Sequence, residues 1–418
     1  MLRSKLGFAA TLSAATLVTG NMVKADDVSR SEVDALKARI AQLESAGQER
    51  VDAAVSNAKL DAMKRDNLFM MADGNAGYDN GFYIQSADGV NKFNPYVQFQ
   101  LRYSLNSAGG VLNDDADIQD GFEIRRMRLG VRGTILSKDL SYDFRYSNNG
   151  GLESAYVKYK FADNMAVRAG QWEDETFRER GISGVKQLAA DRSLADQVIG
   201  GGNLGYVQGA SLLYEEGKIR GEVNLIDGGN SQNTNYQNNG QNFGVGVRAD
   251  YLVNGDFKDA ADFTAKTAKE PLLVIGGGAM WVQSGDTDVL FHTIDALWKQ
   301  DAVSVYGAYI GNWAEGTTDS YNWGVVAQVG YLLPDSKWEL FGRGSLAHID
   351  STFTDENDFY EITVGANYYF QNHNAKATID VGYLPNGAPI GSNVTALDYV
   401  AAEGTGQLAI RGQFQLAF

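Results

Sequence analysis

The sequence contains no cysteine, only three histidines and only five prolines among its 418 residues. Without cysteine, neither a disulfide nor a thiolate-bound metal can hold the fold together. The scarcity of proline leaves long stretches of backbone free to donate the hydrogen bonds of a β-sheet. Beyond the first 25 residues, no apolar run approaches the length of about 18 residues that a membrane-spanning helix needs, so we expect no such helix.

Basic residues are also in the minority, because 36 Lys and Arg stand against 52 Asp and Glu, for a net charge of −16. An acidic chain of this kind argues against a nucleic-acid partner. His292, His348 and His373 are isolated and lack the spacing of metal ligands, and no motif for a nucleophile is present. We therefore expect no catalytic residue, no metal site, no cofactor and no enzyme.

The amino-terminal residues 1–25 have the features of a secretory signal peptide. Arg3 and Lys5 precede an apolar stretch from Leu6 to Thr19, and small or short residues occupy the usual cleavage positions before Ala25. This stretch is too short to span a bilayer. The sequence thus predicts a protein that leaves the cytoplasm.

A helical repeat follows in residues 26–65. Val33, Leu36, Ile40 and Leu43 are spaced by three, four and three residues, and after a break at Gly47 similar steps resume. Such spacing is typical of the seam of a coiled coil, so we predict a short α-helical coiled coil in the periplasm. A single solvated amphipathic helix is the alternative. Residues 66–92 are rich in turn-forming residues and are predicted to be a linker.

From residue 93 to 418 the dominant pattern is alternation. Near the carboxyl terminus, Leu408, Ile410, Phe414, Leu416 and Phe418 share one face of a strand, while polar residues occupy the other. Similar two-faced segments recur about sixteen times. This pattern predicts an all-β fold, a transmembrane antiparallel β-barrel of about sixteen strands whose apolar face contacts outer-membrane lipid.

The lengths of the predicted links also suit a barrel. Links after odd-numbered strands are long, whereas Ser137–Asp139 and Ala162–Asn164, which follow even-numbered strands, are short. A bacterial barrel has short periplasmic turns and longer outer loops, so this difference orients the chain. Gly255–Glu270 is the exception, since it is a long link on the side of the short turns.

The polar face of the early strands is strongly basic. Charged side chains are costly on the lipid face, so strand parity assigns the cations to the lumen. Arg125 has the opposite parity, and it lies either at the membrane rim or on a bulge that turns it inward. A row of such groups concentrates anions, although the arginines could instead pair with carboxylates that hold a loop in place. The predicted pore-lining, anion-binding residues are Arg102, Arg125, Arg126, Arg128, Arg132, Arg145, Lys158, Lys160 and Arg168.

The segment 173–202 is long enough to fold into the barrel and narrow it. We predict a constriction loop here, with charged residues opposite the basic wall. An acidic loop that faces arginines would create a transverse electric field in the channel. The charged residues assigned to this loop are Glu173, Asp174, Glu175, Arg178, Arg180 and Lys186.

Several stretches resemble the phosphate-selective porin O and P family, in the order in which that family has them. They are GFYIQSADG at 81–89, GFEIRRMRLG at 121–130, RAGQW at 168–172, WEL at 338–340 with Arg343, and TVGANYYF at 363–370. The resemblance spans residues 81–418. It implies a homotrimer of sixteen-stranded barrels in the outer membrane, with an inward loop after the fifth strand and an arginine-lined path for phosphate or related anions.

From the arginines of that family, the resemblance carries over Arg125 and Arg126, with Arg102 beside them. The chain departs from the family after Trp172, where a lysine and a proline are replaced by Glu173-Asp174-Glu175. We therefore expect an outer-membrane porin for passive diffusion of small hydrophilic solutes, with a preference for phosphate or related anions. The alternatives are a general porin with a transverse charge field, and a barrel whose main role is to tether the envelope.

Overall fold

The computed structural model describes residues 30–70, 76–78, 81–109, 117–236, 242–268, 270–316, 319–350, 356–390 and 394–418. These residues form two compact units that divide after Met71. The signal peptide predicted for residues 1–25 lies outside the described residues.

The first unit contains the helix α1 (Arg30–Met70), which continues through Gly47 without interruption. It ends five residues later than the predicted coiled-coil segment. Ile40, Leu43 and Val51 of the apolar repeat are each more than half exposed. None of the helices in the described residues is long and apolar enough to cross a membrane.

Two short strands precede the barrel, within the segment predicted as a linker. β1 (Ala76–Tyr78) pairs with β2 (Phe82–Gln85), and β2 pairs with the start of the first barrel strand, where Ile84 lies opposite Phe93. The linker is thus partly a β-hairpin that extends the sheet.

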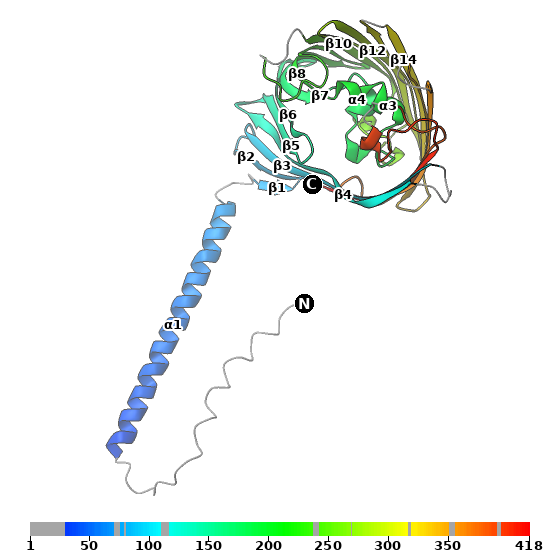
Figure 1. Cartoon of the computed structure of the whole chain (residues 1–418). Coiled ribbons are helices and arrows are strands. Elements are labelled where there is room, and N and C mark those ends of the chain that lie inside the picture. Colours follow the sequence, from blue (N-terminus) through cyan, green and yellow to red (C-terminus); the bar gives the residue numbers. More distant parts are fainter. Residues whose placement is uncertain are drawn as a thin grey trace. The chain divides into compact units, whose positions relative to one another are not determined.

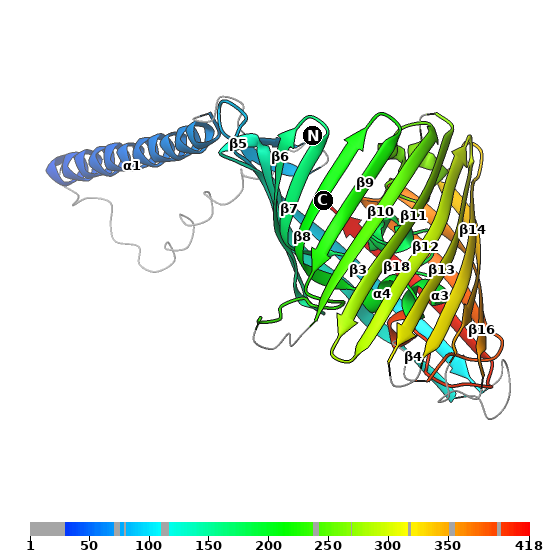
Figure 2. The same ribbon diagram turned by 90° about the horizontal axis from the view of Figure 1, so that it is seen from above.

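Sixteen antiparallel strands close into a barrel in the part of the chain that is described, which confirms the predicted fold class and count (Figure 1). The carboxyl terminus completes the closure, because Val97 and Phe418 exchange backbone hydrogen bonds of 2.7 and 3.0 Å. Figure 2 shows the strands tilted in one sense around the wall. The strands are β3 (Lys92–Ala108), β4 (Asp117–Ile135), β5 (Ser137–Ser147), β6 (Gly151–Ala162), β7 (Met165–Glu173), β8 (Tyr206–Glu216), β9 (Ile219–Ile226), β10 (Phe243–Asn254), β11 (Leu272–Ser284), β12 (Thr287–Gln300), β13 (Val303–Glu315), β14 (Ser320–Leu332), β15 (Trp338–His348), β16 (Asp358–Gln371), β17 (Ala375–Leu384) and β18 (Gln407–Ala417).

The alternation of the sequence corresponds to the two faces of the wall. In β10, Val247 and Tyr251 are exposed on the outside, whereas Arg248 and Asp250 are buried on the inside. An apolar exterior suits the hydrocarbon of a membrane, and closure of the sheet leaves no edge of unpaired backbone groups. The polar residues therefore face the lumen.

The two ends of the barrel differ in their links. We call the end at which β3 begins the turn end, and the opposite end the loop end. At the turn end β4 and β5 are separated by Leu136 alone, whereas at the loop end β7 and β8 are separated by residues 174–205. The link Gly255–Pro271, between β10 and β11, is again the long exception at the turn end.

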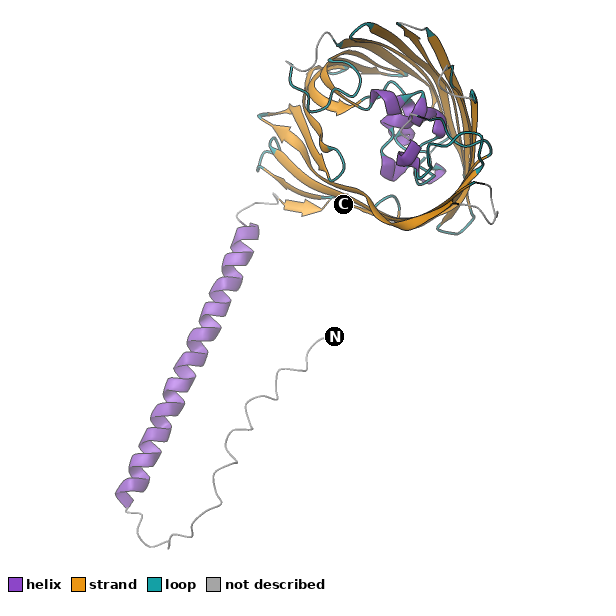
Figure 3. Ribbon diagram, viewed as in Figure 1, coloured by secondary structure: helices purple, strands orange, loops and turns teal. Residues whose placement is uncertain are grey.

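Three links fold into the lumen, and Figure 3 shows their helices within the ring of strands. The link 174–205, which we call the inward loop, packs its apolar side chains against β12 to β15. Phe177 lies 6.4 Å from Phe291, measured between ring centroids, and Leu194 belongs to the same buried cluster as Phe341. The three inward links contain short helices. They are α2 (Arg178–Gly181), η1 (Gly184–Lys186), α3 (Leu194–Val198) and α4 (Gly201–Leu204) in the inward loop, η2 (Phe257–Ala260) and η3 (Ala265–Thr267) in the link after β10, and η4 (Val394–Leu397) in the link before β18.

Candidate functional site

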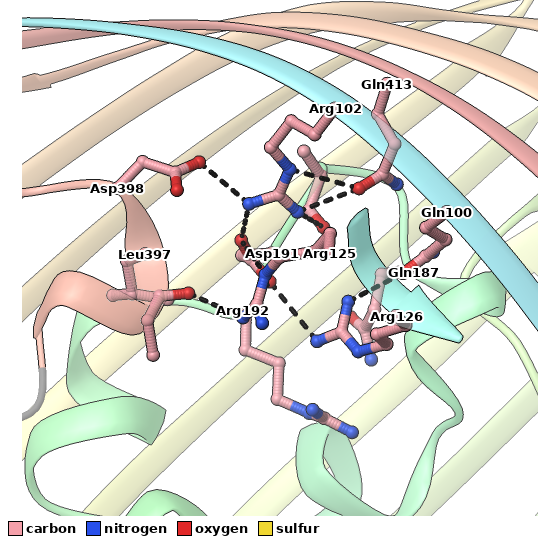
Figure 4. Close-up of polar contacts among 12 residues, drawn as sticks. Gln100, Arg102, Arg125, Arg126, Gln187, Asp191, Arg192, Leu397, Asp398 and Gln413 are labelled. Carbon is pink, nitrogen blue, oxygen red and sulfur yellow. Dashed lines mark hydrogen bonds and ion pairs between the residues drawn. The ribbon is translucent and has the colours of Figure 1, made fainter. Parts of the chain in front are cut away.

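Three arginines of the first two barrel strands converge on one carboxylate of the inward loop, Asp191 (Figure 4). Arg102 donates a hydrogen bond to Asp191, and its side chain is wholly buried. The guanidinium nitrogens of Arg125 and Arg126 lie 3.1 and 3.3 Å from the other oxygen of Asp191. Charge-assisted contacts of this kind are the stronger hydrogen bonds in proteins. The loop is thereby fixed to the basic wall.

Arg125 reaches this cluster because of a β-bulge. Gln100 pairs with Arg126 while the next residue, Leu101, pairs with Ile124, so Arg125 is the extra residue of β4. A bulge turns the side chain of the extra residue away from the face that simple alternation would give it. Arg125 was expected either at the membrane rim or on a bulge that turns it inward. The structure places it on the bulge.

Arg102 also binds a second link, the one before β18. Its guanidinium lies 2.7 Å from the carboxylate of Asp398, which also accepts a hydrogen bond of 2.9 Å from Ser104. Gln413 accepts two further hydrogen bonds from Arg102. Arg102 thus joins β18 and two inward links, and its donors are committed to the protein. Asp398 was missed in the sequence because it lies in a link with no strand or helix repeat.

A second cluster lies beside the first, around Glu153 of β6. Arg128 and Arg145 lie 2.7 and 3.0 Å from its carboxylate. Glu153 is inward because β5 and β6 also contain a bulge: Arg145 pairs with Ser154, whereas Tyr146 pairs with Leu152. Strand parity alone therefore could not identify it as a residue of the lumen.

Glu173, the last residue of β7, is surrounded by arginines. Its carboxylate lies 3.1 Å from Arg180, 3.3 Å from Arg192 and 3.7 Å from Arg145. The negative charge of Glu173 is therefore neutralised by arginines of the inward loop and β5. It does not stand alone in the lumen.

Arg168 of β7 belongs to a third group of charges. It donates to Glu222, and it lies 3.7 Å from Glu175 of the inward loop. Its guanidinium carbon is also 4.3 Å from the ring centroid of Trp172, a cation–π distance. Like Arg102, Arg168 is buried and bound to other residues of the protein.

The remaining loop cations do not form one site with the arginines above. Arg178 donates to Asp295 and, at 2.9 Å, to Asp250, on the side of the lumen away from Asp191. Lys186 is half buried in the 3-10 helix η1. The structure therefore divides the predicted loop residues between separate clusters.

The other wall cations are more accessible. Lys158 and Lys160 of β6 are exposed, and Lys160 lies 3.5 Å from Asp163 in the adjoining turn. Arg132 is exposed and lies 5.4 Å from the ring of Tyr96. These three cations are the most available of the predicted set to a solute.

The loop carboxyl groups differ in ionisation. Burial alone would raise the pKa of Asp191, but the arginines around it hold that pKa well below its usual range. Burial raises the pKa of Asp174 to about 6. Burial next to Glu179 raises the pKa of Asp196 to about 7, and among the described residues no cation forms an ion pair with Asp196. The inward loop therefore carries one carboxyl group with a lowered pKa, that of Asp191, and two with raised pKa values, those of Asp174 and Asp196.

Two cavities lie between the inward loop and the wall from β4 to β10. The one nearer the loop end has a volume of about 230 Å³. It is lined by five arginines (Arg125, Arg126, Arg128, Arg180 and Arg192) and three carboxylates (Glu153, Glu173 and Asp191). The one nearer the turn end has a volume of about 580 Å³. Its charged lining is Lys158, Lys160, Arg178, Lys186, Arg220 and Arg248 against Asp163, Glu175, Glu215, Glu222 and Asp250.

Within the described ranges, no three His, Asp or Glu side chains are arranged to hold a metal ion. The charged groups of the lumen are instead mostly arginine–carboxylate pairs. Such pairs can orient and attract ions, but they supply no nucleophile or proton relay of a recognised kind.

A closed barrel of sixteen antiparallel strands, with an apolar exterior and a charged lumen into which a loop folds, is the architecture of bacterial outer-membrane barrels such as the porins. Residues 93–255 match the model of the family described as phosphate-selective porin O and P, which confirms the resemblance over these residues. The match leaves out the similar stretches at 81–89, 338–343 and 363–370.

Solved porin structures share this fold. The anion-selective porin from Comamonas acidovorans is 15% identical with a TM-score of 0.55, and the similarity covers 78% of this chain and 100% of that one. OmpF of Salmonella typhi, solved with daunomycin, is 16% identical with a TM-score of 0.54, covering 82% and 100%. The trimer form of OmpT from Vibrio cholerae is 12% identical with a TM-score of 0.53, covering 78% and 99%. At these identities the likeness concerns the fold alone. The comparison with curated proteins found no match.

Proposed function

We propose that the protein is an outer-membrane porin that lets small hydrophilic solutes diffuse passively, with a preference for phosphate or related anions. The observation that carries this proposal is the charge of the cavity nearer the loop end, where five arginines stand against three carboxylates. An excess of fixed positive charge in a narrow aqueous space raises the local concentration of anions. The channel is a conduit and not an enzyme.

The pairing of the arginines limits where an anion can bind. Arg102 and Arg168 are buried and already bonded to carboxylates, so they hold the loop and the wall together. Lys158, Lys160 and Arg132 are exposed, and they are the groups most able to replace the hydration water of a passing anion. We infer that these accessible cations add to the excess positive charge of the loop-end cavity in selecting anions, while Arg102 and Arg168 shape the lumen.

The second candidate is a general porin with a transverse charge field. It is favoured by the larger cavity, where six cations face five carboxylates and the net charge is therefore small. A lumen of that kind would discriminate weakly between anions and cations. The two candidates differ in whether phosphate binds long enough to interrupt the current of a smaller anion.

We further propose that the protein is a homotrimer in the outer membrane, with lipid around its apolar exterior and α1 in the periplasm as a coiled coil. The exposed apolar positions Ile40, Leu43, Val51 and Val55 support a helix that packs against copies of itself. The trimer form of Vibrio cholerae OmpT, which has the same fold, is consistent with this assembly. A role in tethering the envelope through α1 is the alternative.

The test is a conductance record of the purified protein in planar bilayers, with chloride, phosphate and an organic anion in turn. Anion-preferring diffusion predicts a chloride current that phosphate reduces at low concentration. A chloride current unaffected by phosphate would favour the general porin. The absence of any ion current from a folded barrel would overturn both.

A further inference from the structure

The link between β10 and β11, Gly255–Pro271, enters the lumen from the turn end. Phe257, Phe263 and Thr264 are buried, with at most 6% of each residue exposed. Gly255, at the start of the link, has a φ of +92°, a conformation that favours glycine. The match to the family model ends at residue 255, so residues 256–271 of this link lie beyond the matched region. We call residues 255–271 the turn-end segment.

Asp262 anchors the turn-end segment to the inner wall. Its carboxylate lies 2.6 Å from the Nζ atom of Lys299 and 3.1 Å from the Nε2 atom of His373. Lys299 also donates a hydrogen bond of 2.6 Å to the backbone oxygen of Asp259. The side chain of Lys299 is fully buried, and the carboxylate of Asp262 balances its charge.

A second anchor lies next to the first. Thr264 donates a hydrogen bond of 2.8 Å to Glu339 of β15, which also accepts one from Tyr369 of β16. Phe263 packs on Tyr306 of β13 with 4.7 Å between the ring centroids. Together with Lys299 on β12, these contacts tie the segment to four strands. It is therefore held in one place as a fixed part of the lumen.

The opposite side of the segment borders a cavity, where Ala261 is exposed. Ala260 and Ala261 line the cavity of about 580 Å³, together with Lys158, Arg220 and Lys186. Phe257 lies beneath Arg220, with 4.7 Å between the guanidinium carbon and the ring centroid, and Arg220 is 2.6 Å from Asp250. One face of the segment thus contacts β12, β13, β15 and β16, and the other borders the same space as the cations of β6.

We propose that the turn-end segment is a second constriction of the channel, at which solutes pass Ala261 and Arg220 after they have passed the inward loop. This inference rests on the proposed channel function and adds a second, separate point at which size and charge are selected.

The absence of native cysteine allows a direct test, because a single introduced thiol is the only one in the chain. In Ala261→Cys, a sulfonate-bearing methanethiosulfonate reagent, added during a planar-bilayer recording, should reduce the single-channel conductance by about twofold or more, since it fills the narrow path. The matched control is Lys337→Cys, in the short β14–β15 turn at the same end but outside the cavity lining. Its modification should leave the conductance unchanged.

Modification of Ala261→Cys, verified by mass, with no change in conductance would overturn the proposal. So would a failure of this thiol to react under conditions in which Lys337→Cys reacts. A second variant replaces residues 256–268 with Asn-Gly and should raise the conductance of each channel. An unchanged conductance in that variant would also contradict the proposal. Failure of the proposed function is distinct, because the unmodified protein would then carry no current.

Discussion

The guanidinium of Arg125 lies 3.1 Å from the carboxylate of Asp191, although simple strand alternation places Arg125 on the lipid face. The extra residue in β4 relative to β3 turns Arg125 inward, so a local irregularity of one strand fixes a loop that lies far away in the sequence. Asp191 consequently forms ion pairs with Arg102, Arg125 and Arg126 together, and it offsets only part of their positive charge. The basic wall and the inward loop act as one charged unit.

Removal of the charge on Asp191 should make the channel more anion-selective. In Asp191→Asn, three arginines lose the carboxylate that they share, and their positive charge becomes available to solutes. We expect the reversal potential in a salt gradient to move further toward that of a pure anion channel. The matched control is Asp335→Asn in the β14–β15 turn, which changes the net charge equally outside the lumen. An equal shift in both variants would contradict a local effect of Asp191.

Neutralisation of Lys158 should lower anion preference with little loss of stability. Lys158 is exposed and lines the larger cavity, so Lys158→Gln removes an accessible charge and breaks no buried pair. Exposed charges contribute about 1 kcal/mol or less to stability, so the thermal unfolding of the barrel should change little. Reversal-potential and melting measurements on the same preparation check both parts. Lys337→Gln serves as the control, and a loss of selectivity in it alone would refute the assignment.

The stability of the barrel should fall as the pH rises from about 5 to about 8. The folded state raises the pKa of Asp196 from its usual value of 3.8 to about 7 through burial beside Glu179. Between pH 3.8 and about 7, Asp196 keeps its proton in the folded protein and loses it in the unfolded chain. The stabilisation is therefore lost as the pH approaches 7 and Asp196 ionises in the folded protein. Asp174, whose pKa is about 6, acts in the same direction.

Asp196→Asn isolates this contribution because the amide does not ionise. The melting temperature of the variant minus that of the unaltered protein should increase as the pH rises from 5 to 8. A difference between the two proteins that does not change with pH would show that Asp196 does not titrate in this range.

Deletion of residues 26–65 should weaken the trimer while each barrel still conducts. The apolar positions Ile40, Leu43 and Val51 are exposed on α1, and a coiled coil would bury them against other copies. Gel mobility in mild detergent at increasing temperature measures the loss of trimers. Ile40→Glu with Leu43→Glu is a gentler variant that keeps the helix length. Stable trimers together with loss of envelope attachment would favour the tethering role instead.

The sixteen strands could be predicted because alternation is a local property of the chain. In β10, for example, Val247 and Arg248 already indicate the two faces of the wall. Bulges are not local in this sense, since the inward position of Glu153 depends on how its neighbours Leu152 and Ser154 pair with β5. The same holds for the partners of the arginines. Nothing near Arg102 in the sequence indicates Asp191 or Asp398, which reach it only once two links fold inward.

The turn-end segment was recognised in the sequence only as a link of unexpected length. Its anchors, such as Asp262 to Lys299 and Thr264 to Glu339, join residues that no repeat or motif connects. Apolar residues on the inward face, such as Phe291 and Ile310, also break the expectation of a polar lumen, because the inward loop packs on them. The position of a link whose sequence has no strand or helix periodicity is set by such packing, so it could not be predicted from the sequence.

The most direct test of the central claim is the reversal potential of the unaltered protein in a planar bilayer with a tenfold gradient of potassium chloride. A lumen whose accessible charge is basic should give a potential of the sign set by chloride, and high salt should reduce it by screening. A potential of the sign set by potassium would contradict the proposal that cations on the inner wall of the barrel select the solute.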